Sequence, residues 1–169
     1  MTASNDLLID AFGRIQETVD DVLSGLGTDE LSARIDDANS IGWLVWHLTR
    51  IQDDHIADAA GTEQIWTAQD WYDRFALPFA EADTGFGHSA DDVAAVRDVS
   101  RQLLNGYHTA VHDNTVRYLK GLQVKDLERV VDEDWAPPVT LGIRLMSVIA
   151  DDLQHAGQAA FVRGVLRRA

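Results

Sequence analysis

One acidic side chain and one imidazole side chain on the same segment have the spacing of a metal-chelating pair. Asp151 and His155 are four residues apart within residues 149–158. On a helix this spacing places both side chains on one face, with Cβ atoms about 5 to 6 Å apart. A carboxylate buried beside imidazoles is costly without a cation, and a divalent ion supplies the missing countercharge. The spacing therefore indicates a bound divalent metal.

A third candidate ligand is His47, which stands three residues after Leu44 and four before Ile51. This position lies on the buried flank of a predicted helix. An isolated inward histidine is more often hydrogen-bonded to a carboxylate or a carbonyl than bound to metal. The chain has no cysteine, so thiolate ligands are excluded and histidine and carboxylate ligands remain.

Two other combinations compete with this set. Asp152 lies nearer than Asp151 to the centre of the apolar face of its helix and could pair with His155 at a spacing of three. His108 and His112 form a second pair with four-residue spacing. Hydrophobic periodicity alone does not choose among these pairs.

Four amphipathic helices are expected to position the candidate side chains. Their apolar residues recur at three- and four-residue steps, and caps and glycines mark their ends. The predicted helices run from Ser4–Asn5 to Gly25, from Asn39–Ser40 to Gly61, from a capping box at Ser89 to Gly121, and from Thr140 to about Arg168. With no convincing strand, residues 1–169 are expected to form one all-α domain, an up-down four-helix bundle.

A long connection rich in aromatic residues separates the second and third predicted helices. It spans residues 62–88, with a short helix expected over residues 68–75. Connections this long are uncommon unless they carry a function. The aromatic residues could cover a pocket as a lid or plug the core, and the sequence favours neither.

The charge balance narrows the classes of partner. The chain has 28 acidic and 14 basic residues, a net charge of −14, which repels nucleic acid and anionic lipid surfaces. Apolar runs are too short to span a bilayer, and the first residues lack the basic start of a signal peptide. We therefore expect a cytoplasmic protein that binds neither nucleic acid nor membrane.

Two segments, SIGWLVWHL (residues 40–48) and LMSVIADDLQHAGQ (residues 145–158), followed by Arg163-Gly164, carry a family resemblance. The chain resembles the DinB/YfiT-like superfamily of metal-binding four-helix bundles along nearly its whole length. It is most similar to the mycothiol S-transferase branch, which is related to mycothiol-dependent maleylpyruvate isomerase. The resemblance implies that His47, Asp151 and His155 bind the metal, and that His108 and His112 do not.

The resemblance also implies an activity. Three protein ligands leave coordination positions open, as in catalytic metal sites. A low-molecular-weight thiol, here mycothiol as cosubstrate, would bind there as a thiolate and attack an electrophile, a detoxification type of S-transfer. Zinc is the expected metal, although nickel, manganese and iron also suit these ligands.

Three further residues are candidates for supporting roles. Arg144 and Gln158 lie two turns to either side of Asp151 and could bind substrate; Arg144 could instead pair with a surface acid. Asp54, two turns beyond His47, could orient a ligand or simply be solvated.

Alternative functions are a metal-dependent isomerase or hydrolase using metal-bound water, and a non-catalytic metal-binding module. The sequence leaves a homodimer open.

Overall fold

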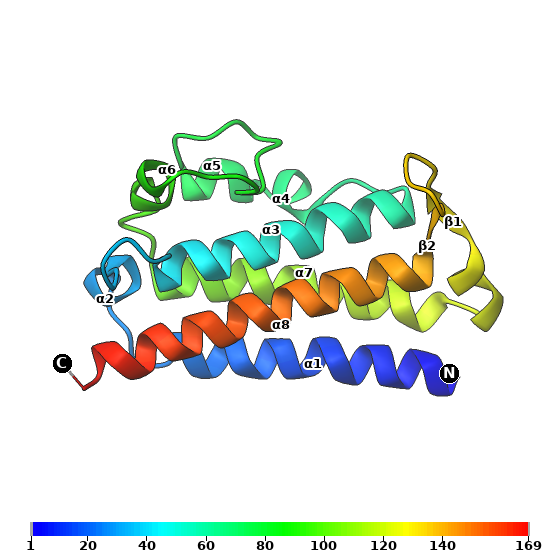
Figure 1. The fold of residues 1–169 in the computed structure, drawn as a ribbon, viewed down its shortest axis with the longest axis horizontal. Coiled ribbons are helices and arrows are strands. Elements are labelled where there is room, and N and C mark those ends of the chain that lie inside the picture. The colour runs from blue at the N-terminus through cyan, green and yellow to red at the C-terminus, as the bar shows by residue number, and fades with distance from the viewer. Residues whose placement is uncertain (1, 169) are drawn as a thin grey trace.

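Four long helices form a bundle in the computed structural model, which describes residues 2–168 (Figure 1). They are α1 (Ala3–Leu23), α3 (Ile41–Ala60), α7 (Arg101–Gly121) and α8 (Leu141–Leu166). Each helix buries an apolar stripe, represented by Phe12, Leu44, Leu104 and Leu145, because three- and four-residue spacing puts such residues on one face. The predicted all-α bundle is confirmed.

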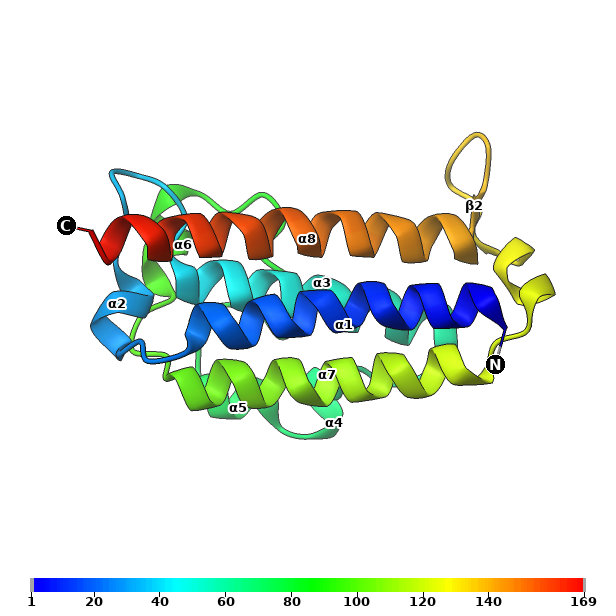
Figure 2. The same ribbon diagram turned by 90° about the horizontal axis from the view of Figure 1, so that it is seen from below.

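The long connection changes the simple up-and-down order of the helices. It returns the chain to the end at which α3 begins, so α7 runs parallel to α3, while α8 runs antiparallel to α3 (Figures 1 and 2). Each helix packs against two neighbours: α3 and α1 both contact α7 and α8. The seam between α3 and α8 therefore joins two helices that are distant in the sequence.

Side-chain caps begin the long helices. The hydroxyls of Ser40 and Thr140 accept hydrogen bonds from the backbone N–H groups of Trp43 and Ile143, as predicted. The predicted cap of the first helix was wrong, because Thr2 is the cap and Asn5 lies inside the helix. The Asn5 side chain is buried and donates to the carbonyl oxygens at the end of α7.

The region predicted as one long third helix is interrupted. The Ser89 capping box is present and opens α6 (Ala90–Ala95), but α7 starts only at Arg101 with a cap from Ser100. Between them Asp98 adopts a positive φ of 61°. The apolar pattern continues across this break because Val96 and Val99 are buried there.

The shorter elements also differ from the sequence prediction. The segment between α1 and α3 contains α2 (Thr28–Ser32), and the expected helix at residues 68–75 is two helices, α4 (Ile65–Ala68) and α5 (Trp71–Phe75). A 3-10 helix, η1 (Val124–Glu128), precedes α8. The expectation of no strand was wrong, because β1 (Val130–Asp132) and β2 (Val139–Thr140) form a small antiparallel pair.

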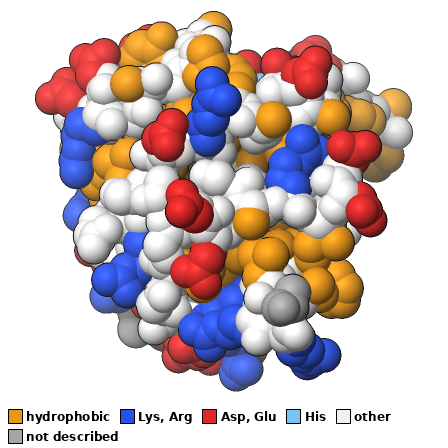
Figure 3. Space-filling view, turned by 90° about the vertical axis from the view of Figure 1, so that its left-hand side faces the viewer, with side chains coloured by type: hydrophobic (Ala, Val, Ile, Leu, Met, Phe, Trp, Pro, Cys, Tyr) orange, Lys and Arg blue, Asp and Glu red, His pale blue; other side chains and the backbone are white. Residues whose placement is uncertain are grey.

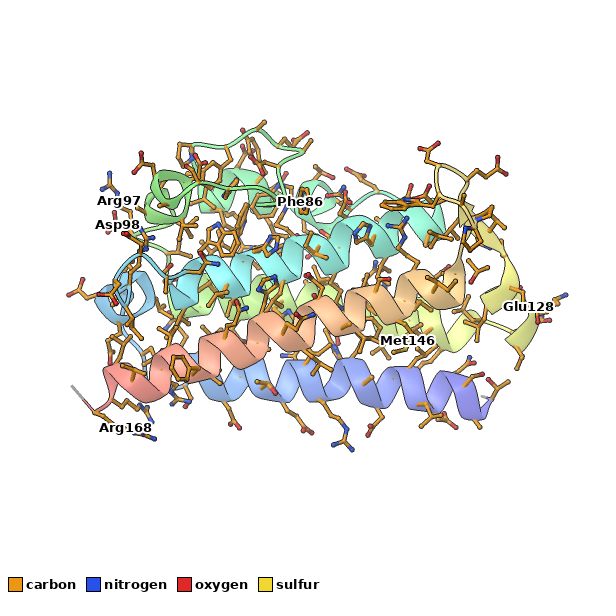
Figure 4. All side chains as sticks on the ribbon, viewed as in Figure 1. Phe86, Arg97, Asp98, Glu128, Met146 and Arg168 are labelled. Carbon is orange, nitrogen blue, oxygen red and sulfur yellow. The ribbon has the colours of Figure 1, made fainter. Side chains whose placement is uncertain are left out.

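The aromatic-rich connection packs into the core. Trp66, Trp71 and Phe75 are buried and their rings surround the Tyr107 ring of α7. Phe86 is the exception: it lies on this connection, near α3 in Figure 4, and is 89% exposed. Most of the aromatic residues thus hold the connection against the bundle.

Buried polar groups anchor the same connection to α3. The Asp53 carboxylate accepts hydrogen bonds from the backbone N–H groups of Ile65 (2.9 Å) and Trp66 (2.8 Å). The Arg50 guanidinium donates to the carbonyl oxygen of Asp83 (3.1 Å). Because α3 supplies both side chains, the position of the connection is tied to this helix.

None of the helices within residues 2–168 has the combination of length and apolar character that crossing a membrane requires.

Candidate metal centre

His47, Asp151 and His155 meet across the seam between α3 and α8. Each offers one ligand atom, and these three atoms lie within 4.8 Å of one another. His155 Nε2 is 3.6 Å from Asp151 Oδ1, and the ring centres of the two histidines are 4.8 Å apart. We call these three side chains the His-Asp-His cluster.

The ring of His47 is held by contacts on two sides. Its Nδ1 atom lies 2.5 Å from the backbone carbonyl oxygen of Thr84, and the Trp43 ring stacks on it with centres 4.6 Å apart. A carbonyl can only accept, so Nδ1 carries the proton and Nε2 keeps its lone pair. This is the orientation that a metal-ligating histidine needs.

Gly85 allows the loop to approach His47 so closely. Its φ of +89° is in the left-handed region, and a Cβ atom at this position would lie 2.9 Å from both His47 Nδ1 and a Trp46 ring carbon. A side chain here would therefore be strained and would collide with the cluster. Thr84 and Gly85 were not predicted from the sequence, because a backbone carbonyl and a loop glycine leave no periodic signal.

The other half of the cluster contains an unpaired carboxylate oxygen. The Oε1 atom of Gln158 lies 3.1 Å from His155 Nδ1, and this nitrogen donates to it. Asp151 Oδ2 is buried and, among residues 2–168, has no hydrogen-bond partner. A buried orphan oxygen beside two imidazoles fits a divalent cation, because the ion would satisfy all three groups at once.

The electrostatics of the cluster keep its carboxylate charged. Hydrogen bonding and proximity to His155 hold the pKa of Asp151 below its ordinary value, and the same pairing raises the pKa of His155. Burial lowers the pKa of His47, which favours the neutral, ligating form of this ring. One anionic and two imidazole ligands form the donor set of many zinc sites.

The competing candidates lie elsewhere. Asp152 is fully buried in the bundle, and desolvation, followed by the charge of Asp151, raises its pKa well above the ordinary value. His108 is also fully buried, with its Nδ1 atom 3.1 Å from the Thr49 hydroxyl, and burial lowers its pKa to about 3. His112, one turn further, is half-buried. Of the competing combinations, the structure therefore brings together His47, Asp151 and His155.

The predicted supporting residues have different surroundings. Arg144 donates to Asp132 Oδ2 at 2.6 Å and contacts His55 Nδ1 at 3.1 Å, the acid pairing that the sequence left as its alternative role. Asp54 accepts from the Gln64 side chain at 2.8 Å. Of the three, Gln158 alone is hydrogen-bonded to a cluster histidine, and the Thr84 carbonyl, which was not predicted, pairs with the other.

A pocket of about 580 Å³ lies beside the cluster. It is bounded by α8, the beginning of α3 and the segment that leads into α3, and Gln158 lines it. Figure 3 faces this end of the molecule, where hydrophobic side chains gather in patches between charged ones. A pocket of this size accommodates a small organic molecule.

Comparisons with known proteins agree with this architecture. The family model described as mycothiol-S-transferase matches residues 7–168. A crystal structure of a conserved protein from Enterococcus faecalis is similar to this chain, with 30% sequence identity, a TM-score of 0.88 and 96% of each chain covered. A search of curated proteins gives no match.

Proposed function

The chain belongs to the mycothiol-S-transferase family, and we propose that it transfers mycothiol to an electrophile at the His-Asp-His cluster. The observation that carries the proposal is the convergence of ligand atoms of His47, Asp151 and His155 within 4.8 Å, with Asp151 Oδ2 unpaired among the described residues. Divalent zinc is the metal that we propose for this donor set of two imidazoles and one carboxylate, which nickel, manganese and iron also suit.

A divalent ion held by these residues would act as a Lewis acid that lowers the pKa of a coordinated thiol. The chain contains no cysteine, so the nucleophilic sulfur must come from the cosubstrate. This division of labour agrees with the family to which the chain belongs, in which the thiol is a substrate.

The surrounding residues would orient the ligands. The Thr84 carbonyl keeps the proton of His47 on Nδ1, so that Nε2 faces the cluster. Gln158 does the same for His155 through its Oε1 atom. The charge of Asp151 would offset part of the charge of a divalent ion. Three protein ligands would leave room for one more ligand at a four-coordinate ion.

The test compares purified protein with single-ligand variants. We expect elemental analysis to find about one divalent ion per wild-type chain, and that His47→Ala, Asp151→Asn and His155→Ala each lose most of it. His112→Ala is the matched control, because this half-buried histidine lies outside the cluster. The same proteins are then assayed for consumption of mycothiol in the presence of an electrophile such as iodoacetamide.

Two outcomes would contradict the proposal. Normal metal content in all three ligand variants would show that the ion is bound elsewhere. Substrate turnover at an undiminished rate without any thiol would indicate an isomerase or hydrolase instead. Loss of both metal and thiol-dependent turnover in the three variants, and in them alone, is the expected result.

A further inference from the structure

The pocket beside the His-Asp-His cluster has a mainly apolar wall. Residues of three segments contribute to it: the connection before α3, the first turn of α3 and the C-terminal half of α8. The apolar side chains are Ile35, Ala38, Leu44, Phe161 and Val162. From this pocket we infer that the electrophilic cosubstrate carries an uncharged apolar group, which binds here; the inference rests on the proposed function.

The pocket lies one helical turn from the cluster along the same seam. Leu44 precedes His47 by three residues on α3, and Gln158 follows His155 by three residues on α8. Three residues correspond to a rise of about 4.5 Å. Gln158 also joins the two sites directly, because its side chain lines the pocket and accepts from His155. A group seated in the pocket would therefore place its reactive carbon next to a sulfur at the cluster.

The charge distribution favours a neutral ligand. Within the described residues, the pocket is lined without any acidic or basic side chain; its polar groups are the amides of Asn39 and Gln158. In residues 143–161, which the structure describes in full, every exposed position of α8 is uncharged, including Met146 (Figure 4). An anionic ligand would find no countercharge in the pocket and would be repelled by a chain of net charge −14.

The opposite flank of the cluster differs in character. Going the other way along the seam, His55 follows His47 by two turns and Arg144 precedes Asp151 by two turns, and these two side chains touch. The Arg144 guanidinium is paired with Asp132, so this flank is polar and already holds a carboxylate. The apolar group of an electrophile is therefore better matched to the pocket than to this polar flank.

The transfer that this arrangement allows is a simple displacement. The thiolate sulfur forms a bond to the electrophilic carbon while the bond from carbon to halide breaks and the halide leaves with the electron pair. The thiol proton passes to solvent. Neither an oxidant nor a reductant is required.

Gly157 offers a way to fill the pocket without disturbing the fold. It lies in the pocket wall on α8, and a Cβ atom there meets nothing within 4 Å. Gly164 lies on the same helix outside the pocket and is equally unobstructed. Gly157→Leu and its matched control Gly164→Leu both replace glycine by a better helix former, so both should fold.

The first measurement is direct binding of 1-naphthalenemethanol, a neutral unreactive probe, by calorimetry. We expect Gly157→Leu to weaken this binding by about tenfold or more and Gly164→Leu to change it less than twofold. Naphthoate, the anionic counterpart, should bind wild type more weakly than the alcohol. Equal binding of the alcohol by both variants, or stronger binding of naphthoate, would overturn the inference.

The second measurement is turnover with mycothiol and two electrophiles. Gly157→Leu should raise the KM for 1-(chloromethyl)naphthalene by about tenfold and change the KM for the small electrophile iodoacetamide much less. If wild type binds the probe but shows no mycothiol turnover, the proposed function fails and the apolar site stands. If sedimentation shows that the wild-type chain is a dimer and that Gly157→Leu dissociates this dimer, a second copy of the chain occupies the pocket. The electrophile site is then refuted.

Discussion

His47 Nδ1 lies 2.5 Å from the backbone carbonyl oxygen of Thr84. The two residues belong to different parts of the chain, one to α3 and the other to the long connection after it. This hydrogen bond means that the connection, which contributes no ligand of its own to the His-Asp-His cluster, controls the orientation of a cluster histidine. Hydrogen bonds to the second ring nitrogen are known to tune metal affinity.

Replacing Gly85 by alanine should weaken metal binding. The new Cβ atom would lie 2.9 Å from His47 Nδ1, so the loop must move and the bond from His47 to Thr84 must lengthen. We expect the zinc affinity to fall about 10- to 100-fold, which is the loss found when other hydrogen bonds that orient a metal ligand are removed. Competition with a chromogenic chelator measures this affinity. Gly87→Ala is the control: its φ is also positive, at +77°, but its Cβ atom would meet nothing within 4 Å. Equal losses in both variants would attribute the effect to backbone strain alone.

Replacing Arg50 by methionine should destabilise the whole protein. Arg50 and Asp53 form an ion pair with 3.9 Å between Nη1 and Oδ2, and both side chains are buried. Removing the guanidinium leaves the buried carboxylate of Asp53 without its positively charged partner, so the free energy of unfolding should fall by about 3 kcal/mol. Urea denaturation measures this change. Arg14→Met breaks an exposed ion pair with Asp10 and should cost less than about 1 kcal/mol; similar costs for both would contradict the prediction.

Asp152→Asn should stabilise the protein increasingly as the pH rises. The folded-state pKa of Asp152 is raised well above its ordinary value by burial. Above the ordinary pKa the unfolded chain loses this proton while the folded chain keeps it, so wild-type stability is lost with rising pH until the folded pKa is reached. The difference in unfolding free energy between Asp152→Asn and wild type should therefore grow between pH 5 and pH 8. The exposed Asp113 on α7 gives the matched control Asp113→Asn, measured over the same pH range. Equal pH dependence of the two variants would contradict the prediction.

His108 should give the opposite pH dependence. Burial lowers its folded-state pKa to about 3, below the ordinary value near 6.5 for histidine. Between these two values the unfolded chain binds one proton more, so stability falls as the pH drops, by up to about 1.4 kcal/mol per pH unit. His108→Asn cannot titrate and retains a group that can pair with Thr49. Its stability should depend less on pH below 6.5 than that of wild type, and identical slopes in urea titrations would refute the assignment.

The sequence predicted features that depend on local spacing. The four long helices follow from apolar stripes, and the Ser40 and Thr140 caps from side chains at helix starts. Asp151 and His155 share a face because they are one turn apart on a continuous helix, and the fold brings His47 to that face. The family resemblance is confirmed by the match over residues 7–168, whereas metal binding by these residues stays a prediction.

The features that the sequence did not predict depend on tertiary contacts. The break before α7 carries buried valines, so the apolar pattern shows no gap at that point. Thr2 caps α1, while the Asn5 amide inside this helix donates to the carbonyl oxygens of Leu119 and Leu122, more than a hundred residues away. The Thr84 carbonyl is a backbone atom, and its contact with His47 is invisible in the pattern of side chains.

The anchoring of residues 62–88 to α3 has a consequence for how ligands would reach the His-Asp-His cluster. Swinging this segment outward would break the buried contacts of Arg50 and Asp53 and expose Trp66. Under the proposed function, reactants and products would therefore exchange through the pocket between α8 and the start of α3, while residues 62–88 stay in place. The dwell time of a product should scale with its hydrophobicity, and solvent viscosity should slow release only as far as it slows free diffusion.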